Sequence, residues 1–219
     1  MKKIFATILT ASLMLVATNA FAQLSAGAGY LNATETTAYK QSEDKTLYEK
    51  SQYNGFYVGA QYDMPIPAVS GLGIEAGAYA NFYFGKNHSD GLLGTGFGAG
   101  TTSTSDITLN IPINATFGFD IAGDTNVFAY AGPTFQFGLV NKSTFVLDSD
   151  KSSSTTTDNF AGDTPNRNRF NLLIGGGIGA QVSGIRITVG VDQSILNYET
   201  ADKYTGSRFQ LKIGAGYAF

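Results

Sequence analysis

Cysteine is absent from this chain, and charged residues are scarce in it. The 219 residues include no cysteine, one histidine and 14% charged residues, and the formal net charge is −3. Without cysteine, disulfides, a catalytic thiolate and a cysteine-ligated metal site are all excluded. Average soluble domains carry about 25% charged residues, so the shortfall indicates a surface that mostly meets lipid. A mildly acidic chain with no basic run also gives no electrostatic reason to bind nucleic acid.

Long apolar runs are missing as well, apart from a short one at the N-terminus. No segment after residue 22 has the ~18 consecutive apolar residues that indicate a transmembrane helix. At the N-terminus, two lysines precede a mostly apolar run over 4–16, and the tripeptide A-F-A ends at Ala22. These features are typical of a cleaved secretory signal peptide. We therefore predict that residues 1–22 are removed and that residues 23–219 form a single domain.

Period-two alternation is the pattern that the chain has in abundance. Successive side chains of a strand point to opposite faces, so alternating apolar and polar residues predict a strand with one apolar face. Eight segments show this pattern: 24–32, 55–64, 72–84, 107–119, 127–139, 170–182, 185–195 and 207–219. No helical segment is left to cover the apolar faces, so lipid must cover them. Strands that span a membrane must close into a barrel, because only a closed ring pairs every backbone group.

The last of these segments has the clearest signature. It reads S-R-F-Q-L-K-I-G-A-G-Y-A-F, with an apolar residue at every second position up to Phe219. Such a final strand resembles that of bacterial outer-membrane β-barrels, the small porin-like family that includes the OmpA-type and OmpX-type transmembrane barrels. The resemblance implies an all-β, eight-stranded antiparallel transmembrane barrel with an up-and-down meander, integral to outer-membrane lipid. It also implies that Tyr217 and Phe219 form an insertion signal for the barrel-assembly machinery.

The predicted connections alternate in length. Those at 65–71, 122–126 and 183–184 are short, whereas longer polar stretches join the other pairs. Short periplasmic turns and long outer loops are typical of outer-membrane barrels. The third outer loop, residues 141–166, is rich in serine, threonine, aspartate and asparagine, so we expect it to be mobile or to form a short hairpin extension. Pro133 cannot donate to a ladder, which predicts a β-bulge in the fifth strand.

Ionisable residues are predicted at inward positions of several strands. In order from the periplasmic end toward the outside, they are Asp63, Glu75, Arg186, Asp192, Lys212 and Arg208. Eight strands enclose an interior that side chains can fill, which disfavours an open solute pore. A buried charge is costly unless it is paired, so we expect Lys212 and Arg186 to pair with carboxylates. Their expected partners are Asp192 and Glu75, with Tyr57, Tyr79 and Tyr83 filling the space around them. The alternatives are that these charges only fill a plugged core, or that they gate a conducting one.

Several motif matches do not indicate chemistry. The G-x-G-x-x-A match at 175–180 precedes a strand, whereas a dinucleotide site needs a helix to receive the pyrophosphate. The glycine-rich stretch 94–100 lacks the Lys-Ser/Thr of a phosphate loop. His88 stands beside Ser89 and Asp90, but adjacent residues of a strand diverge, so a nucleophile and its base do not converge. A single histidine with scattered carboxylates lacks metal-ligand spacing. We therefore expect no catalytic residue, cofactor or metal.

These patterns favour a non-enzymatic integral outer-membrane barrel with a structural or adhesion-like surface role. Its loops would then bind an extracellular ligand or a host surface. A narrow porin-like channel for ions or small solutes is the first alternative. An accessory barrel of a secretion or envelope-assembly machine is the second. Mobile inward charges favour the channel, and ordered polar loops favour surface binding.

Overall fold

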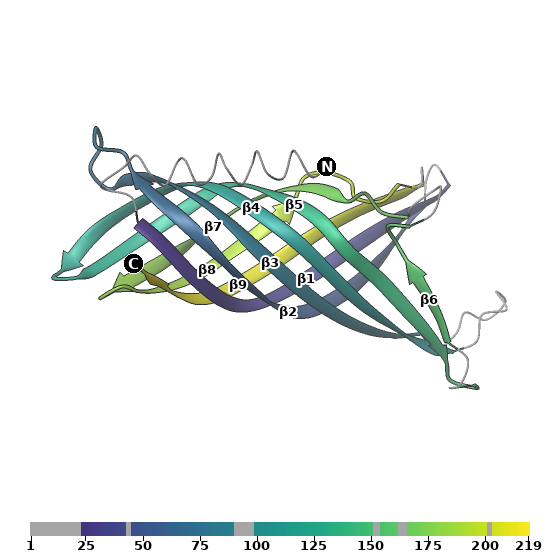
Figure 1. Ribbon diagram of the computed structural model, residues 1–219. Coiled ribbons are helices and arrows are strands. Elements are labelled where there is room, and N and C mark those ends of the chain that lie inside the picture. The colour runs from purple at the N-terminus through teal and green to yellow at the C-terminus, as the bar shows by residue number, and fades with distance from the viewer. Residues whose placement is uncertain (1–22, 43–44, 90–98, 151–153, 162–165, 201–202) are drawn as a thin grey trace, which may run out of the picture.

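A computed structural model describes residues 23–42, 45–89, 99–150, 154–161, 166–200 and 203–219 (Figure 1). The predicted signal peptide, residues 1–22, lies outside these ranges. The strands are β1 (Gln23–Ser42), β2 (Lys45–Pro65), β3 (Leu72–Ser89), β4 (Gly100–Ala122), β5 (Thr125–Leu147), β6 (Ser154–Asp158), β7 (Phe170–Val182), β8 (Ile185–Ser194) and β9 (Tyr204–Ala218). Over the described ranges, no helix is long and apolar enough to cross a membrane.

Eight of these strands form a closed antiparallel ring (Figure 1). β1 to β5 pair in chain order, β7 follows β5, and β8 and β9 complete the sequence. The ring closes where β9 pairs with β1, from Ser25 opposite Ala218 to Tyr39 opposite Tyr204. β6 pairs with β5 alongside the ring and is not part of it. The structure therefore confirms the eight-stranded up-and-down barrel that the alternation predicts.

The outer ends of the strands extend further than predicted. β1 and β2 stay paired as far as Ser42 and Lys45, and β5 continues to Leu147. Much of the sequence predicted as long outer loops is therefore strand. The strands were predicted from alternating apolar residues, which face lipid and therefore end at the edge of the lipid layer. Backbone hydrogen bonds between strands do not need lipid and continue beyond that edge. The third outer connection contains a hairpin, formed by β5 and β6.

Pro133 does not mark a bulge, contrary to the prediction. It lies opposite Ile174 on β7, and the register of that ladder is constant over residues 125–137 of β5. The β4–β5 ladder shifts register elsewhere, next to Ile107 and again next to Asp120. A proline removes one backbone donor but adds no residue, so the neighbouring residues keep regular pairing around it.

The outward face of the ring is an apolar belt. Large apolar side chains are exposed on all sides of it, among them Phe56, Ile74, Phe117, Leu139, Ile178, Ile187, Ile213 and Tyr217. Ile178, for example, is 67% exposed. Phe56 and Phe82 stack with their ring centroids 4.8 Å apart, and Tyr217 meets Phe219 near the chain end at 5.4 Å. Soluble proteins do not expose apolar area on this scale, so the belt is the surface that contacts lipid.

Small residues inside the ring make room for tyrosine rings. A Cβ built on Gly214 of β9 would collide with the hydroxyl and ring of Tyr57, which reaches across from β2. We predict that Gly214→Ala lowers the free energy of unfolding by about 1–3 kcal/mol, because an overpacked site must shift. In a Tyr57→Ala background, the same substitution is expected to cost nearly nothing. Urea unfolding in lipid vesicles, arranged as a double-mutant cycle, measures this coupling. An equal cost in both backgrounds would contradict the contact.

Candidate functional site in the barrel lumen

Charged side chains gather at three levels of the lumen, and the first group lies nearest the short turns. Asp63 and Glu75 are opposite each other on β2 and β3. Arg186 Nη1 lies 2.9 Å from Asp63 Oδ2, and Arg186 Nη2 contacts Glu75. Gln61 and Asn114 each donate a 2.9 Å hydrogen bond to Glu75. The expected pairing of Arg186 with Glu75 is therefore present, and Asp63 shares the guanidinium.

The second group lies midway along the barrel. Lys212 Nζ is 2.6 Å from Asp192 Oδ2, as the sequence analysis expects. Gln210 Nε2 also donates to Asp192 Oδ2 at 2.6 Å, and Tyr83 donates to Gln210 Oε1 at 2.6 Å. Asn81 Nδ2 donates in turn to the Tyr83 oxygen at 2.9 Å. The Asp192 carboxylate therefore has two donors, and a chain of hydrogen bonds connects it to β3.

A cluster of buried and mostly apolar side chains, which we call the central layer, begins at the level of this group and extends toward the outer end. It consists of Leu31, Ala33, Tyr53 and Tyr83. Three of the four side chains are 0% exposed, and Tyr53 is 5% exposed. Along the β1–β9 ladder, Leu31 lies opposite Lys212, and Ala33 lies opposite Gln210. These side chains come from β1, β2 and β3 and pack beside buried polar side chains of β8 and β9, such as Asp192 and Gln210. Together the two sets leave only small cavities between the Lys212 level and the outer charged group.

The third group lies beyond the central layer, toward the outer ends of the strands. The Arg208 guanidinium contacts both Glu35 and Asp106, and its Nε donates to Glu35 Oε1 at 2.9 Å. Arg167 enters from the segment before β7 and places its Nη2 2.6 Å from Glu35 Oε2. Both carboxylates are only 2% exposed. Arg208 also lies over the ring of Tyr83, 4.7 Å from its centroid, so this group rests directly on the central layer.

The sequence analysis named Arg208 but missed its partners Glu35, Asp106 and Arg167. Glu35 continues the inward row of Leu31 and Ala33, two residues further along β1, so the alternation carried a signal for it. It was missed because its stretch was predicted to be loop. Asp106 likewise lies one inward step beyond the predicted start of its strand. Arg167 lies outside the ring strands, where alternation gives no information.

Arg167 also joins the outer connections to one another. Its guanidinium lies over the Tyr198 ring at 4.7 Å, and its Nε is 3.7 Å from Glu199 Oε1. Burial raises the pKa of the Glu199 carboxyl above its ordinary value, while Arg167 acts in the opposite direction. The segments before β7 and before β9 are therefore held together over the outer end of the lumen.

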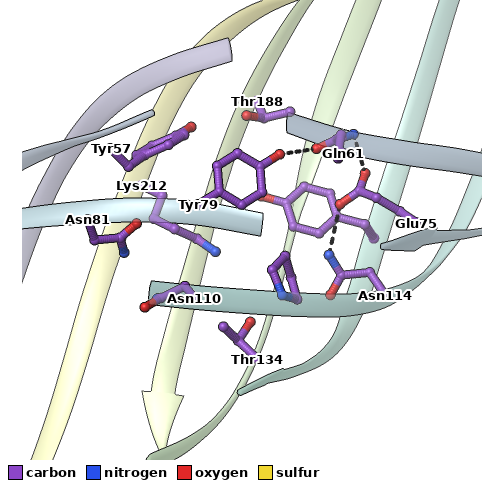
Figure 2. A pocket seen from close by; sticks show the side chains of 12 residues that line it. Tyr57, Gln61, Glu75, Tyr79, Asn81, Asn110, Asn114, Thr134, Thr188 and Lys212 are labelled. Carbon is purple, nitrogen blue, oxygen red and sulfur yellow. Dashed lines mark hydrogen bonds between the residues drawn. The ribbon is translucent and has the colours of Figure 1, made fainter. Parts of the chain in front are cut away.

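Empty space inside the barrel is divided into small polar cavities. The central chamber is about 50 Å³ and is lined by twelve residues, including Glu75, Tyr79 and Lys212 (Figure 2). In Figure 2, Gln61 and Asn114 bond to Glu75 on one side of this chamber. Two other cavities are about 30 Å³ each. A vestibule of about 500 Å³, bordered by the β2–β3 turn, opens at the end of the barrel that carries the short turns. The enclosed cavities are large enough for a few waters, each of which needs ~10–15 Å³ by this measure.

Among the described residues, the remaining candidates do not converge on a reaction centre. His88 is exposed, with Nδ1 3.3 Å from Thr101 Oγ1 and Nε2 3.7 Å from Asp148 Oδ2. Its sequence neighbour Asp90 lies outside the described residues. The glycines at 175–180 belong to β7, which leads into β8, as the sequence analysis expects. Among the described residues, no cluster of three histidines or carboxylates could hold a metal ion.

Comparison with known proteins returns matches of structure only. No protein-family model matches the sequence, and no curated protein matches it. Ail, the attachment invasion locus protein of Yersinia pestis, is 12% identical, with 89% of this chain and 99% of Ail aligned at a TM-score of 0.36. The outer membrane protein OprG from Pseudomonas aeruginosa is 12% identical, with 90% and 95% aligned at a TM-score of 0.41. The outer membrane enzyme PagL is 10% identical, with 85% and 98% aligned at a TM-score of 0.36.

The fold itself identifies the class of protein. Its backbone groups are paired around a closed ring, its outer surface is an apolar belt, and its charges lie inside or beyond the belt. A ring of this kind is one of the two structures that satisfy every backbone group within lipid. Alternation of lipid-facing and lumen-facing residues is the pattern of outer-membrane barrels. The protein is an eight-stranded antiparallel β-barrel with the apolar outer belt of an integral membrane barrel.

Proposed function

We propose that the protein is a non-enzymatic surface protein whose outer strand extensions bind an extracellular partner. The observation that carries this proposal is the length of β1 and β2 beyond the belt. The outward row of β1 changes from Tyr30 to Asn32, Thr34 and Thr36, which are polar, while β1 stays paired to Ser42. The twelve residues after Tyr30, up to Ser42, extend roughly 40 Å along the strand. Such a paired wall is ordered, and an ordered surface binds at a lower entropic cost than a disordered loop does.

Exposed aromatic and aliphatic side chains near the tip of this wall support a binding role. Tyr48 is 70% exposed and Leu47 is 47% exposed, both near the end of the β1–β2 hairpin. Tyr39 packs against Tyr204 of β9 with ring centroids 4.9 Å apart. Aromatic residues are enriched in protein interfaces, and tyrosine is frequent among the residues that dominate binding energy.

A binding assay tests this proposal. Cells displaying the protein are allowed to adhere to immobilised fibronectin or laminin, with a Leu47→Ser/Tyr48→Ser variant for comparison. We expect adhesion to at least one coat, reduced about tenfold or more in the variant, because a buried interface anchor is worth ~2 kcal/mol or more. The control is Thr37→Ser/Thr46→Ser, which changes the same hairpin but removes only two methyl groups. Equal adhesion of all three proteins, or none above empty cells, would count against a surface-binding role.

The polar cavities favour a second candidate, a narrow channel for ions or small solutes. The periplasmic vestibule is bordered by Asp63 and Arg186, and the chamber above it is lined by polar side chains and tyrosine rings. The central layer opposes this candidate, because dry apolar constrictions stop ions by excluding water. We therefore rank the channel below surface binding.

A further inference from the structure

Exposed lysines are distributed unevenly between the two ends of the barrel. Those with described side chains are Lys40, Lys50, Lys86, Lys142 and Lys203, and all lie beyond the outer edge of the belt. At the opposite end, the β4–β5 turn carries the exposed carboxylates Asp120 and Asp124. Exposed carboxylates occur at both ends, since Glu49, Asp148 and Asp158 lie at the outer end, so it is the lysines that distinguish the two ends.

Lys86 is next to the lipid-facing belt. Tyr83 of β3 is fully buried in the lumen, so the residues at even positions from Phe82 onward face outward. Phe84 is 52% exposed, and Lys86 is the next outward residue along β3. Two residues span roughly 7 Å along a strand. This places the Lys86 ammonium at the depth where apolar lipid chains give way to head groups.

Lys142 lies on the same outward surface, two strands away. Asp106 and Asn141 are opposite each other and buried in the lumen, so their neighbours Ser105 and Lys142, which are also paired, face outward. Ser105 in turn lies opposite Phe84 on β3, and Ser103 lies opposite Lys86. Two lysines thus flank two serines on adjoining strands. From strand spacing and rise, the Cα atoms of the lysines are roughly 12 Å apart. We call these four residues the Lys86–Lys142 patch.

The chemistry of this patch suits phosphate. Ammonium and hydroxyl groups donate hydrogen bonds, and anionic phosphate oxygens accept them. Asp158 of β6 is opposite Lys142, but on the side of β5 away from the serines. We propose that the Lys86–Lys142 patch binds phosphate groups on the lipid head groups of the outer leaflet. This binding would anchor the barrel at a defined depth, and it does not depend on the partner of the β1–β2 wall.

Retention of a phosphorylated lipid by the purified protein tests the proposal. The full-length protein is reconstituted in nanodiscs of neutral phosphatidylcholine containing a small fraction of diphosphorylated lipid A. Detergent is then used to extract the barrel, and the lipid A retained per barrel is measured by mass spectrometry. We expect Lys86→Glu/Lys142→Glu to retain at least about fivefold less than the unchanged protein, because each lysine near an anionic surface contributes about that factor. Raised salt should reduce retention by the unchanged protein.

A matched variant distinguishes binding at the Lys86–Lys142 patch from a general effect of the net charge of the protein. Lys40 and Lys203 lie together near the outer tip, where the Lys40 N–H donates to the Lys203 carbonyl at 3.0 Å. Lys40→Glu/Lys203→Glu makes the same change in net charge far from the belt, and we expect it to retain lipid A normally. Equal losses in both variants, or no loss in the first, would overturn the proposal. Displacement of lipid A by millimolar inorganic phosphate would also overturn it, since the site would then bind free phosphate. Heat-dependent gel mobility confirms that each variant is folded.

Discussion

Replacing Arg208 by methionine is expected to lower the free energy of unfolding by about 3–5 kcal/mol. The guanidinium is shared between Glu35 and Asp106, and both carboxylates are buried. After the substitution, Glu35 keeps Arg167 as its partner, but Asp106 loses the cation that balances its charge. Urea unfolding in lipid vesicles, followed by circular dichroism and gel mobility, measures the change.

The size of this loss should depend on the charges left behind. Asp106→Asn/Arg208→Met removes the guanidinium together with the carboxylate that it would leave unpaired, and the Glu35–Arg167 pair remains. We expect this double variant to recover most of the lost stability, because no charge is left without a counter-ion. Lys142→Met serves as the control for an exposed cation, and its effect should remain within about 0.5 kcal/mol. If the double variant were as unstable as Arg208→Met, the guanidinium would stabilise the barrel through packing over Tyr83 and not through charge.

In planar bilayers, the unchanged protein and Lys212→Ala are both expected to show no single-channel steps. The central layer fills the lumen at Tyr83 and at Leu31, which lies opposite Lys212, and both side chains are 0% exposed. Removing Lys212 leaves this layer in place. By contrast, Leu31→Ala/Tyr83→Ala should produce discrete steps, because the charged levels on either side are polar and an apolar constriction is the barrier to water and ions.

Leu211→Ala is the control for this experiment. Leu211 is the residue next to Lys212 in β9, on the opposite, outward face. Its truncation removes a similar apolar group without widening the lumen, so it should remain silent. Steps in the unchanged protein that alter in Lys212→Ala would contradict the proposed seal. They would place the constriction at the Lys212–Asp192 pair and favour the channel as the function.

Much of this barrel follows from alternation along the chain. Period-two patterning has a direct geometric cause, so it identified the eight ring strands and which residues face inward. The prediction of 170–182 coincides with β7, and the inward assignments of Arg186 and Asp192 agree with their burial. Inward charges at matching depths were enough to expect the pairs of Lys212 with Asp192 and of Arg186 with Glu75.

Other features depend on contacts between distant residues. Glu35 and Arg208 are 173 residues apart and meet only because β9 closes the ring against β1. Backbone hydrogen bonds between β1 and β2 set how far the two strands extend at the outer end. That part of the sequence has no alternating apolar residues that would indicate a strand. The prediction of a bulge at Pro133 was wrong, because whether a strand accommodates a proline depends on its pairing with the strands on both sides, here β4 and β7. By itself, the sequence determined strand number, facing and membrane residence, since these follow from local periodicity. The tertiary structure decided which charges meet and where the lumen is sealed, because register and ring closure bring those groups together.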